Sequence, residues 1–176
     1  GLLGAWIGAR VAGVRFWSFV DAVAPGVLLA QAIGRWGNYF NQELFGTPTT
    51  LPWGLEIDIT NPAYPAGLPA GVLFHPTFLY ESVWSLIGVV LLINLDKRFE
   101  LRWGKLFAVY LVYYSTIRFW LEGMRVDPSA YFLSLRTNQW SAIVGVVVGI
   151  ALFAYLKRRH TGVEPSVYVR EPAVKE

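Results

Sequence analysis

The chain has 176 residues, of which 55% are hydrophobic and only 15% are charged, and its mean hydropathy is +0.42. Ordinary soluble domains are about 45–50% apolar and about 25% charged, so the composition excludes that class and indicates a membrane protein. The sequence has no cysteine, which excludes a disulfide framework, a cysteine metal ligand and a thiol nucleophile. The net charge is +3, but the basic residues form short clusters between apolar runs. We therefore interpret these clusters as signals of membrane topology and expect no nucleic-acid partner.

Five apolar segments follow one another along the chain. The first, residues 1–14, is shorter than the roughly 20 residues that span a bilayer, so we expect a truncated helix. The only methionine is Met124, which excludes Gly1 as an ordinary translation start, and we expect an N-terminal part to be absent. Glycine and proline interrupt the second segment, as membrane helices tolerate. We therefore expect an all-α fold, a polytopic membrane helical bundle whose four longer segments are residues 19–38, 76–95, 105–124 and 138–156.

Lysine and arginine clusters alternate between the ends of successive segments, as the positive-inside rule predicts for cytoplasmic loops. They lie at Arg10 and Arg15, at residues 97–105 and at residues 157–159. The alternation predicts that the loop at residues 46–74 and the turn at residues 125–136 face outward. We expect residues 1–159 to form one transmembrane domain and residues 160–176 to be a disordered cytoplasmic tail.

A first polar cluster lies in AIGRWGNYFNQELFG, residues 32–46, directly after an apolar run. If the helix continues, Arg35, Asn38 and Gln42 share one face, and a turn at this point would also bring the amides together. The structural alternative is a helix end that frays into the headgroup region. Five polar residues within nine positions favour a site over fraying.

A second cluster is FHPTFLYE, residues 74–81. A helix is expected to begin at Pro76, and His75 just before it has a simple alternative reading as a capping residue. Tyr80 and Glu81 fall in the first turns of a membrane helix, where an unpaired carboxylate is costly enough to need a partner.

The third cluster is RFWLEGMR, residues 118–125. Arg118, Glu122 and Arg125 have the spacing i, i+4, i+7, which places the carboxylate between two guanidinium groups on one stripe of a helix. A charge near the bilayer centre costs about 2.5–3.5 kcal/mol, so these residues need partners or a polar cavity. A purely structural ion-pair stripe is the alternative. Guanidinium groups bind phosphate well, so an anionic phospholipid headgroup is the expected ligand.

The three clusters resemble the motifs of the prolipoprotein diacylglyceryl transferases, in the same order and over nearly the whole chain. GRWGNYFNQELFG matches the family pattern through Gly34, Arg35, Gly37, Asn38, Tyr39, Asn41, Glu43 and Gly46. HPTFLYE matches through His75, Pro76, Leu79, Tyr80 and Glu81, and RFWLEGMRVD matches through Arg118, Phe119, Glu122 and Arg125.

The resemblance implies a multi-pass enzyme of the bacterial cytoplasmic membrane with its active site toward the outer face. Such an enzyme transfers the diacylglyceryl group of phosphatidylglycerol to the lipobox cysteine thiol in a prolipoprotein signal peptide. A thioether forms and glycerol phosphate leaves, which is the first step of bacterial lipoprotein maturation. The resemblance implies no metal and no organic cofactor.

The same resemblance implies roles for single residues. Arg35 and Arg118 are expected to be catalytic, because they would bind the leaving phosphate and stabilise its charge. The rest of the site, expected to bind and orient substrate together with Arg35, comprises Asn38, Asn41, Glu43, Gly46, His75, Tyr80, Glu81, Glu122 and Arg125.

The chain also departs from the family. Full-length members carry a conserved tyrosine and a His-Gly-Gly motif before the point where this chain begins, and that histidine is a proposed thiol-activating base. The resemblance gives no reason to assign this role to His75. Residues 1–159 are therefore expected to be the C-terminal portion of the family fold, with the phosphate site but without activity on their own.

Two other classes of protein are alternatives to the transferase. A transporter of anionic lipids or anions would use the same arginines to line a route, and broken helices with glycines suit transporters. Its route would need polar residues at the inner face, where LIGVVLLIN and VVVGIALFAYL are apolar. A non-catalytic scaffold would leave the polar clusters without a purpose, so the order of preference is transferase, transporter, scaffold.

Overall fold

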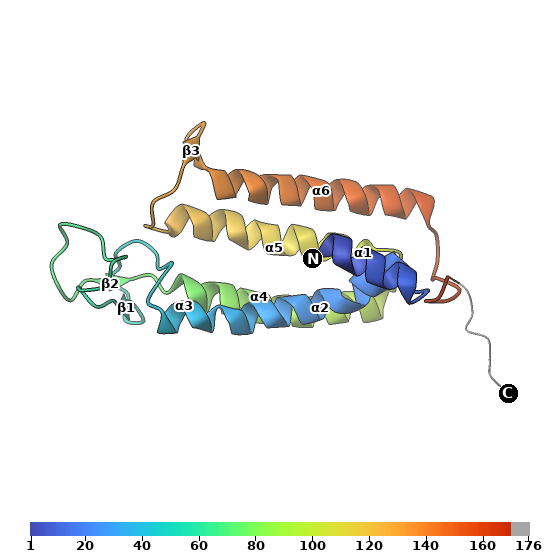
Figure 1. Cartoon of the computed structure of the whole chain (residues 1–176), viewed down its shortest axis with the longest axis horizontal. Helices are drawn as coiled ribbons and strands as arrows, with labels where there is room; N and C mark the ends of the chain where they lie inside the picture. The colour runs from blue at the N-terminus through green and yellow to red at the C-terminus, as the bar shows by residue number, and fades with distance from the viewer. Residues whose placement is uncertain (170–176) are drawn as a thin grey trace.

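Helices form most of the part of the chain that the computed structural model describes, residues 1–169 (Figure 1). Two antiparallel hairpins, β1–β2 and β3–β4, connect helices at one end of the bundle. The elements in chain order are α1 (Leu2–Val11), α2 (Phe16–Gly34), α3 (Trp36–Phe40), β1 (Leu55–Glu56), β2 (Leu73–Phe74), α4 (Thr77–Phe99), α5 (Lys105–Met124), β3 (Tyr131–Phe132), β4 (Leu135–Arg136) and α6 (Thr137–Arg159).

Three helical stretches in residues 1–169 are long and apolar enough to cross a membrane: Phe16–Phe40, Thr77–Phe99 and Thr137–Arg159. The prediction of a polytopic helical bundle is confirmed, but its count of about five apolar segments is not. With 10 residues, α1 is too short to span. With 20 residues, α5 has the necessary length, yet it is less apolar than the other three because Arg118 and Glu122 interrupt its C-terminal half.

The long helices pack around α5, which lies between α6 and the pair formed by α2 and α4 (Figure 1). Small residues let α6 approach α5 closely, as is common between membrane helices. A Cβ added at Gly145 would lie 2.3 Å from Ser115 Oγ, and one added at Gly149 would lie 2.7 Å from Val112 Cγ2. Glycine at these two positions therefore sets the distance between the helices.

Apolar side chains both fill the bundle and cover its outside. Ala24, Leu28 and Leu92 are fully buried between α2, α4 and α5. The outward surfaces of α4 and α6 are apolar as well, which would be costly in water but is natural against lipid. Their exposed residues include Val83, Leu86, Ile87 and Val90 on α4 and Val144, Val147, Val148 and Ile150 on α6.

We name the end of the bundle that carries β1–β4 the hairpin end. Phe45, Ile57 and Phe74 form a small buried cluster there, which anchors the long loop to the start of α4. Gly46 joins this loop to two helices, because its N–H donates to the carbonyl of His75 at 2.9 Å and its backbone bridges to Arg125. A Cβ at Gly46 would lie 2.8 Å from His75 Cβ, so this junction requires glycine.

We name the opposite end, where α4 ends and α5 begins, the basic end. The buried carboxylate of Asp21 on α2 accepts N–H bonds from Gly104 at 2.7 Å and from Phe107 at 2.8 Å. It thereby satisfies backbone donors that the first turn of α5 leaves free. A side chain on one helix thus caps another and fixes their relative height.

The sequence predicts disorder from residue 160 onward, but residues 160–169 make defined contacts at the basic end. The ring of His160 stacks on Trp103 with 4.3 Å between centroids. Glu164 accepts hydrogen bonds from the backbone N–H of Trp103 at 3.0 Å and from the Ser18 hydroxyl. These aromatic and polar partners explain the order of this part. The rest of the predicted tail, residues 170–176, lies outside the described residues.

Candidate phosphate-binding site

The first motif folds as a helix followed by a turn. Arg35 separates α2 from α3, and α3 ends at Phe40. Gln42 has a positive φ of 48°, so the helix does not continue, and its side-chain oxygen accepts the N–H of Asp58 at 2.9 Å. Of the two arrangements that the sequence left open, the structure has the turn, and Gln42 does not share a face with Arg35 and Asn38.

Glu81 on α4 connects two arginines from different helices. Its Oε1 lies 2.8 Å from Arg35 Nη2, and its Oε2 lies 3.4 Å from Arg118 Nη1 on α5. The hydroxyl of Tyr114 donates a third bond to Oε1 at 3.2 Å. Glu81 is buried, so these partners are the compensation that a carboxylate in a membrane helix needs.

Glu122 gathers the charged residues of the third motif. It is fully buried, and its Oε2 lies 3.3 Å from Arg118 Nη2 and 3.2 Å from Arg125 Nη1. Asn138 on α6 donates to its Oε1 at 3.1 Å. The predicted stripe of Arg118, Glu122 and Arg125 is therefore confirmed, and the structure adds a partner from a second helix.

Arg136, a buried residue that the sequence analysis missed, joins the same network. Its Nη1 donates to the carbonyls of Glu122 at 2.9 Å and Arg125 at 2.8 Å, and its Nη2 lies 3.2 Å from Asp127 Oδ2. One signal was available: an arginine in a loop predicted to face outward runs against the positive-inside rule and needs another purpose. Tyr114, Asp127 and Asn138 were also missed, and no spacing pattern marks them.

The amides of the first motif form the exposed rim of the site. Asn38 Nδ2 and Asn41 Nδ2 both donate to Glu43 Oε1, at 2.9 and 3.2 Å. Arg35 Nη1 donates to Asn38 Oδ1 at 3.4 Å, which connects this rim to the arginines. The structure therefore brings Arg35, Asn38, Asn41 and Glu43 together, as the sequence predicts.

His75 and Tyr80 form a neighbouring group with Trp53. The hydroxyl of Tyr80 lies 3.0 Å from His75 Nδ1 and accepts the Trp53 indole N–H at 3.1 Å. No hydrogen bond or ion pair within residues 1–169 connects this group to the arginines. The helix α4 begins at Thr77 with Pro76 as its N-cap, one residue later along the chain than expected, and no side chain caps it. The simple reading of His75 as a capping side chain therefore gains no support.

A narrow cleft opens among the charged side chains. Its free volume is about 10 Å³, which is room for about one water molecule. A phosphate group would therefore enter only if the arginines moved away from Glu81. The cleft is lined by Arg35, Asn38, Leu44, Thr77, Phe78, Glu81, Arg118, Leu121 and Arg125.

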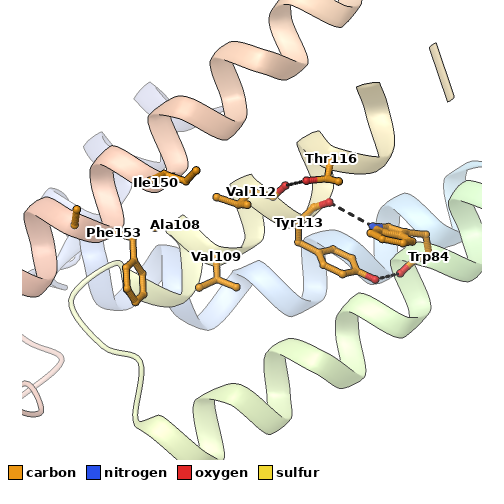
Figure 2. Close-up of a pocket in the computed structure, with 9 residues that line it drawn as sticks. Trp84, Ala108, Val109, Val112, Tyr113, Thr116, Ile150 and Phe153 are labelled. Atoms are coloured by element: carbon orange, nitrogen blue, oxygen red, sulfur yellow. Dashed lines mark hydrogen bonds between the residues drawn. The ribbon is translucent and has the colours of Figure 1, made fainter. Parts of the chain in front are cut away.

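A much larger groove, of about 560 Å³, lies between α4, α5 and α6 (Figure 2). Trp84 and Tyr113 stack at one side of it with 4.8 Å between ring centroids, and each donates to the other's backbone carbonyl. Val112 and Ile150 are among its apolar lining residues, and it has no charged lining residue. The groove therefore offers no chemistry for binding phosphate. No group of three or more His, Asp or Glu side chains in residues 1–169 could hold a metal ion.

The fold and this network define a multi-pass membrane protein with a buried arginine and carboxylate site at one end of its bundle. Comparison with known protein families identifies its family. The model of the family described as "Prolipoprotein diacylglyceryl transferase" matches residues 1–155. The chain belongs to the prolipoprotein diacylglyceryl transferase family.

Similar proteins come from several bacteria. A phosphatidylglycerol–prolipoprotein diacylglyceryl transferase of Leifsonia xyli subsp. xyli is 54% identical over 170 residues, which are 96% of this chain and 51% of the relative. Proteins of the same name from Streptomyces coelicolor and Cutibacterium acnes are 48% and 49% identical, over 93% and 91% of this chain and 51% and 53% of the relatives. The chain spans about half the length of the curated relatives it matches.

Proposed function

We propose that this chain carries the phospholipid site of an enzyme that transfers the diacylglyceryl group of phosphatidylglycerol to the lipobox cysteine of prolipoproteins. The names of the relatives and the family membership support this reaction. The structural observation that supports it most is the carboxylate of Glu81, whose two oxygens face Arg35 and Arg118. Two arginines that share a buried carboxylate in this way can share a phosphate group.

The reaction requires stabilisation of a leaving anion. The cysteine sulfur forms a bond to a glycerol carbon while the bond from that carbon to the phosphate oxygen breaks. The thiol proton passes to a base or to the phosphate. Glycerol phosphate leaves with the electron pair of the broken bond, so negative charge develops on its phosphate oxygen. Guanidinium groups held in place in a low-dielectric site stabilise this developing charge in the transition state. We assign this role to Arg35 and Arg118.

The remaining residues support that pair. Glu122 and Arg125 hold Arg118 from one side, and Asn38, Asn41 and Glu43 form the rim through which the headgroup would enter. Gly46 keeps the loop against Arg125. The carbonyl of His75 accepts the N–H of Gly46, and we propose that His75 and Tyr80 contact substrate rather than the phosphate itself.

We further propose that the hairpin end faces the outside of the cytoplasmic membrane. The lysine and arginine residues of the basic end support this orientation, because such clusters remain cytoplasmic. Both proposed partners, phosphatidylglycerol and the signal peptide of a prolipoprotein, would then meet at the outer surface. No observation favours the transporter alternative.

The proposed function is tested by measuring the transfer of the diacylglyceryl group to a peptide. The full-length enzyme that contains these residues is incubated with phosphatidylglycerol and a lipobox peptide, and mass spectrometry detects the peptide thioether. A peptide with Cys→Ser at the lipobox and a reaction with zwitterionic phosphatidylcholine are the controls. We expect product only with the thiol and the anionic lipid. Absence of thioether from a folded enzyme that binds both substrates would contradict the proposed function.

A further inference from the structure

The backbone of Arg136 is fixed by two elements of secondary structure. The residue ends β4 and is the N-cap residue of α6. Its backbone N–H donates to Gln139 Oε1 at 3.0 Å, so the third residue of α6 caps the backbone of Arg136. The β3–β4 hairpin pairs it with Tyr131. The start of the side chain is therefore fixed by both a strand and a helix.

The guanidinium group of Arg136 is buried in the charged network. The residue is only 2% exposed, and it binds the carbonyls of Glu122 and Arg125 and both the carbonyl and the carboxylate of Asp127. Its Nε lies 3.5 Å from Glu122 Oε1 but makes no hydrogen bond within residues 1–169. Arg136 therefore acts on the carboxylate of Glu122 mainly through charge.

The ion pairs form one connected network of seven residues. It runs from Arg35 through Glu81, Arg118 and Glu122 to Arg125, Asp127 and Arg136. Four arginines face three carboxylates, which leaves one positive charge in excess. Without Arg136 the network would be neutral, and Arg118 and Arg125 alone would have to balance Glu122 and Asp127. Charges interact strongly at such sites because the surroundings have a low dielectric constant.

We propose that Arg136 is a positioning residue of the phospholipid site. By pairing with Glu122 and Asp127, it leaves the positive charge of Arg118 and Arg35 available to the phosphate of an anionic lipid. Arg136 does not line the cleft, so it acts through the other residues. The proposal rests on the proposed function, since it specifies how the same site selects an anion.

The test compares Arg136→Gln and Arg136→Lys in the full-length enzyme. We expect the glutamine variant to raise the KM for phosphatidylglycerol on the order of tenfold, the scale of one lost charge-assisted interaction, with little change in the KM for the lipobox peptide. The lysine variant keeps the charge and is expected to recover part of the loss. Arg102→Gln is the matched control, because it removes an ion pair to Asp96 at the basic end.

A double variant separates charge from structure. In Arg136→Gln with Asp127→Asn, one positive and one negative charge are removed, so the excess positive charge returns and lipid binding is expected to recover. A structural role would predict further loss instead. Unchanged KM for phosphatidylglycerol in Arg136→Gln, or equal increases in the KM for lipid and peptide, would overturn the proposal.

Binding of phosphatidylglycerol to the same variants in detergent distinguishes this proposal from the proposed function. If the wild-type enzyme binds the lipid but forms no thioether, the transfer reaction is wrong while Arg136 is still tested by binding. Thermal unfolding of each variant reports its folding. If Arg136→Gln does not fold, the lysine variant decides, because it keeps the positive charge: lipid binding lost tenfold or more by a folded Arg136→Lys variant would overturn the proposal.

Discussion

Arg35 and Glu81 form an ion pair with 2.8 Å between Nη2 and Oε1, and this contact joins the end of α2 to the start of α4. Arg118 of α5 binds the other oxygen of the same carboxylate. Three helices therefore meet at one carboxyl group. The cleft beside it has room for about one water molecule, so under the proposed function a phosphate would compete with Glu81 for the two arginines.

Arg118→Lys tests whether the guanidinium shape matters as well as its charge. Arg118 binds Glu81 and Glu122 through different nitrogens, and an ammonium group cannot reproduce such a fork. We expect the full-length enzyme to lose most of its transfer activity, measured as thioether formation. Arg102→Lys, at the basic end, should leave activity unchanged. Near-normal turnover by Arg118→Lys would favour a purely structural ion pair.

Arg35→Ala is expected to weaken phosphatidylglycerol binding. Loss of a charge-assisted hydrogen bond to a buried anion costs about 1.5–3 kcal/mol, which corresponds to a roughly ten- to hundredfold decrease in affinity. Binding to the full-length enzyme in detergent measures the change, and phosphatidylcholine binding serves as the reference because Arg35 should matter less for a zwitterionic headgroup. Equal affinity of wild type and variant for phosphatidylglycerol would remove Arg35 from the headgroup site.

Single cysteines test the orientation of the bundle. Thr50 lies in the long loop of the hairpin end, Lys97 lies at the basic end, and both are exposed. In a cysteine-free background in intact cells, an impermeant thiol reagent should label Thr50→Cys but not Lys97→Cys. Ile87→Cys, on the apolar surface of α4, is the control for a position within lipid. Equal labelling at the two ends would contradict the proposed sidedness.

Gly145→Ala tests the close packing of α6 on α5. The added methyl group would lie 2.3 Å from Ser115 Oγ, so the helices must separate, and overpacking of this kind typically costs about 1–3 kcal/mol. Gly26→Ala in α2 is the matched control, because a Cβ there meets nothing within 4 Å. We expect a lower thermal unfolding temperature only for the Gly145 variant. If the two variants unfold alike, Gly145 does not set the spacing of the helices.

Features that depend on local spacing could be predicted from the amino-acid sequence. Apolar length predicted the membrane helices, although α5 is less apolar than expected because it carries part of the site. The spacing of Arg118, Glu122 and Arg125 predicted their contact, since residues three and four apart lie on one face of a helix. The polar clusters likewise predicted which segments carry the ion pairs, because charged groups in a membrane helix must find partners.

The identity of those partners depends on how the helices and loops pack in three dimensions. Glu81 could have paired with several arginines, and the packing of α2, α4 and α5 selects Arg35 and Arg118. The turn after α3 directs Gln42 away from the site, and the β3–β4 hairpin brings Arg136 into it. Contacts between distant segments depend on how closely helices approach and where loops return, and no periodic pattern in the sequence records these distances.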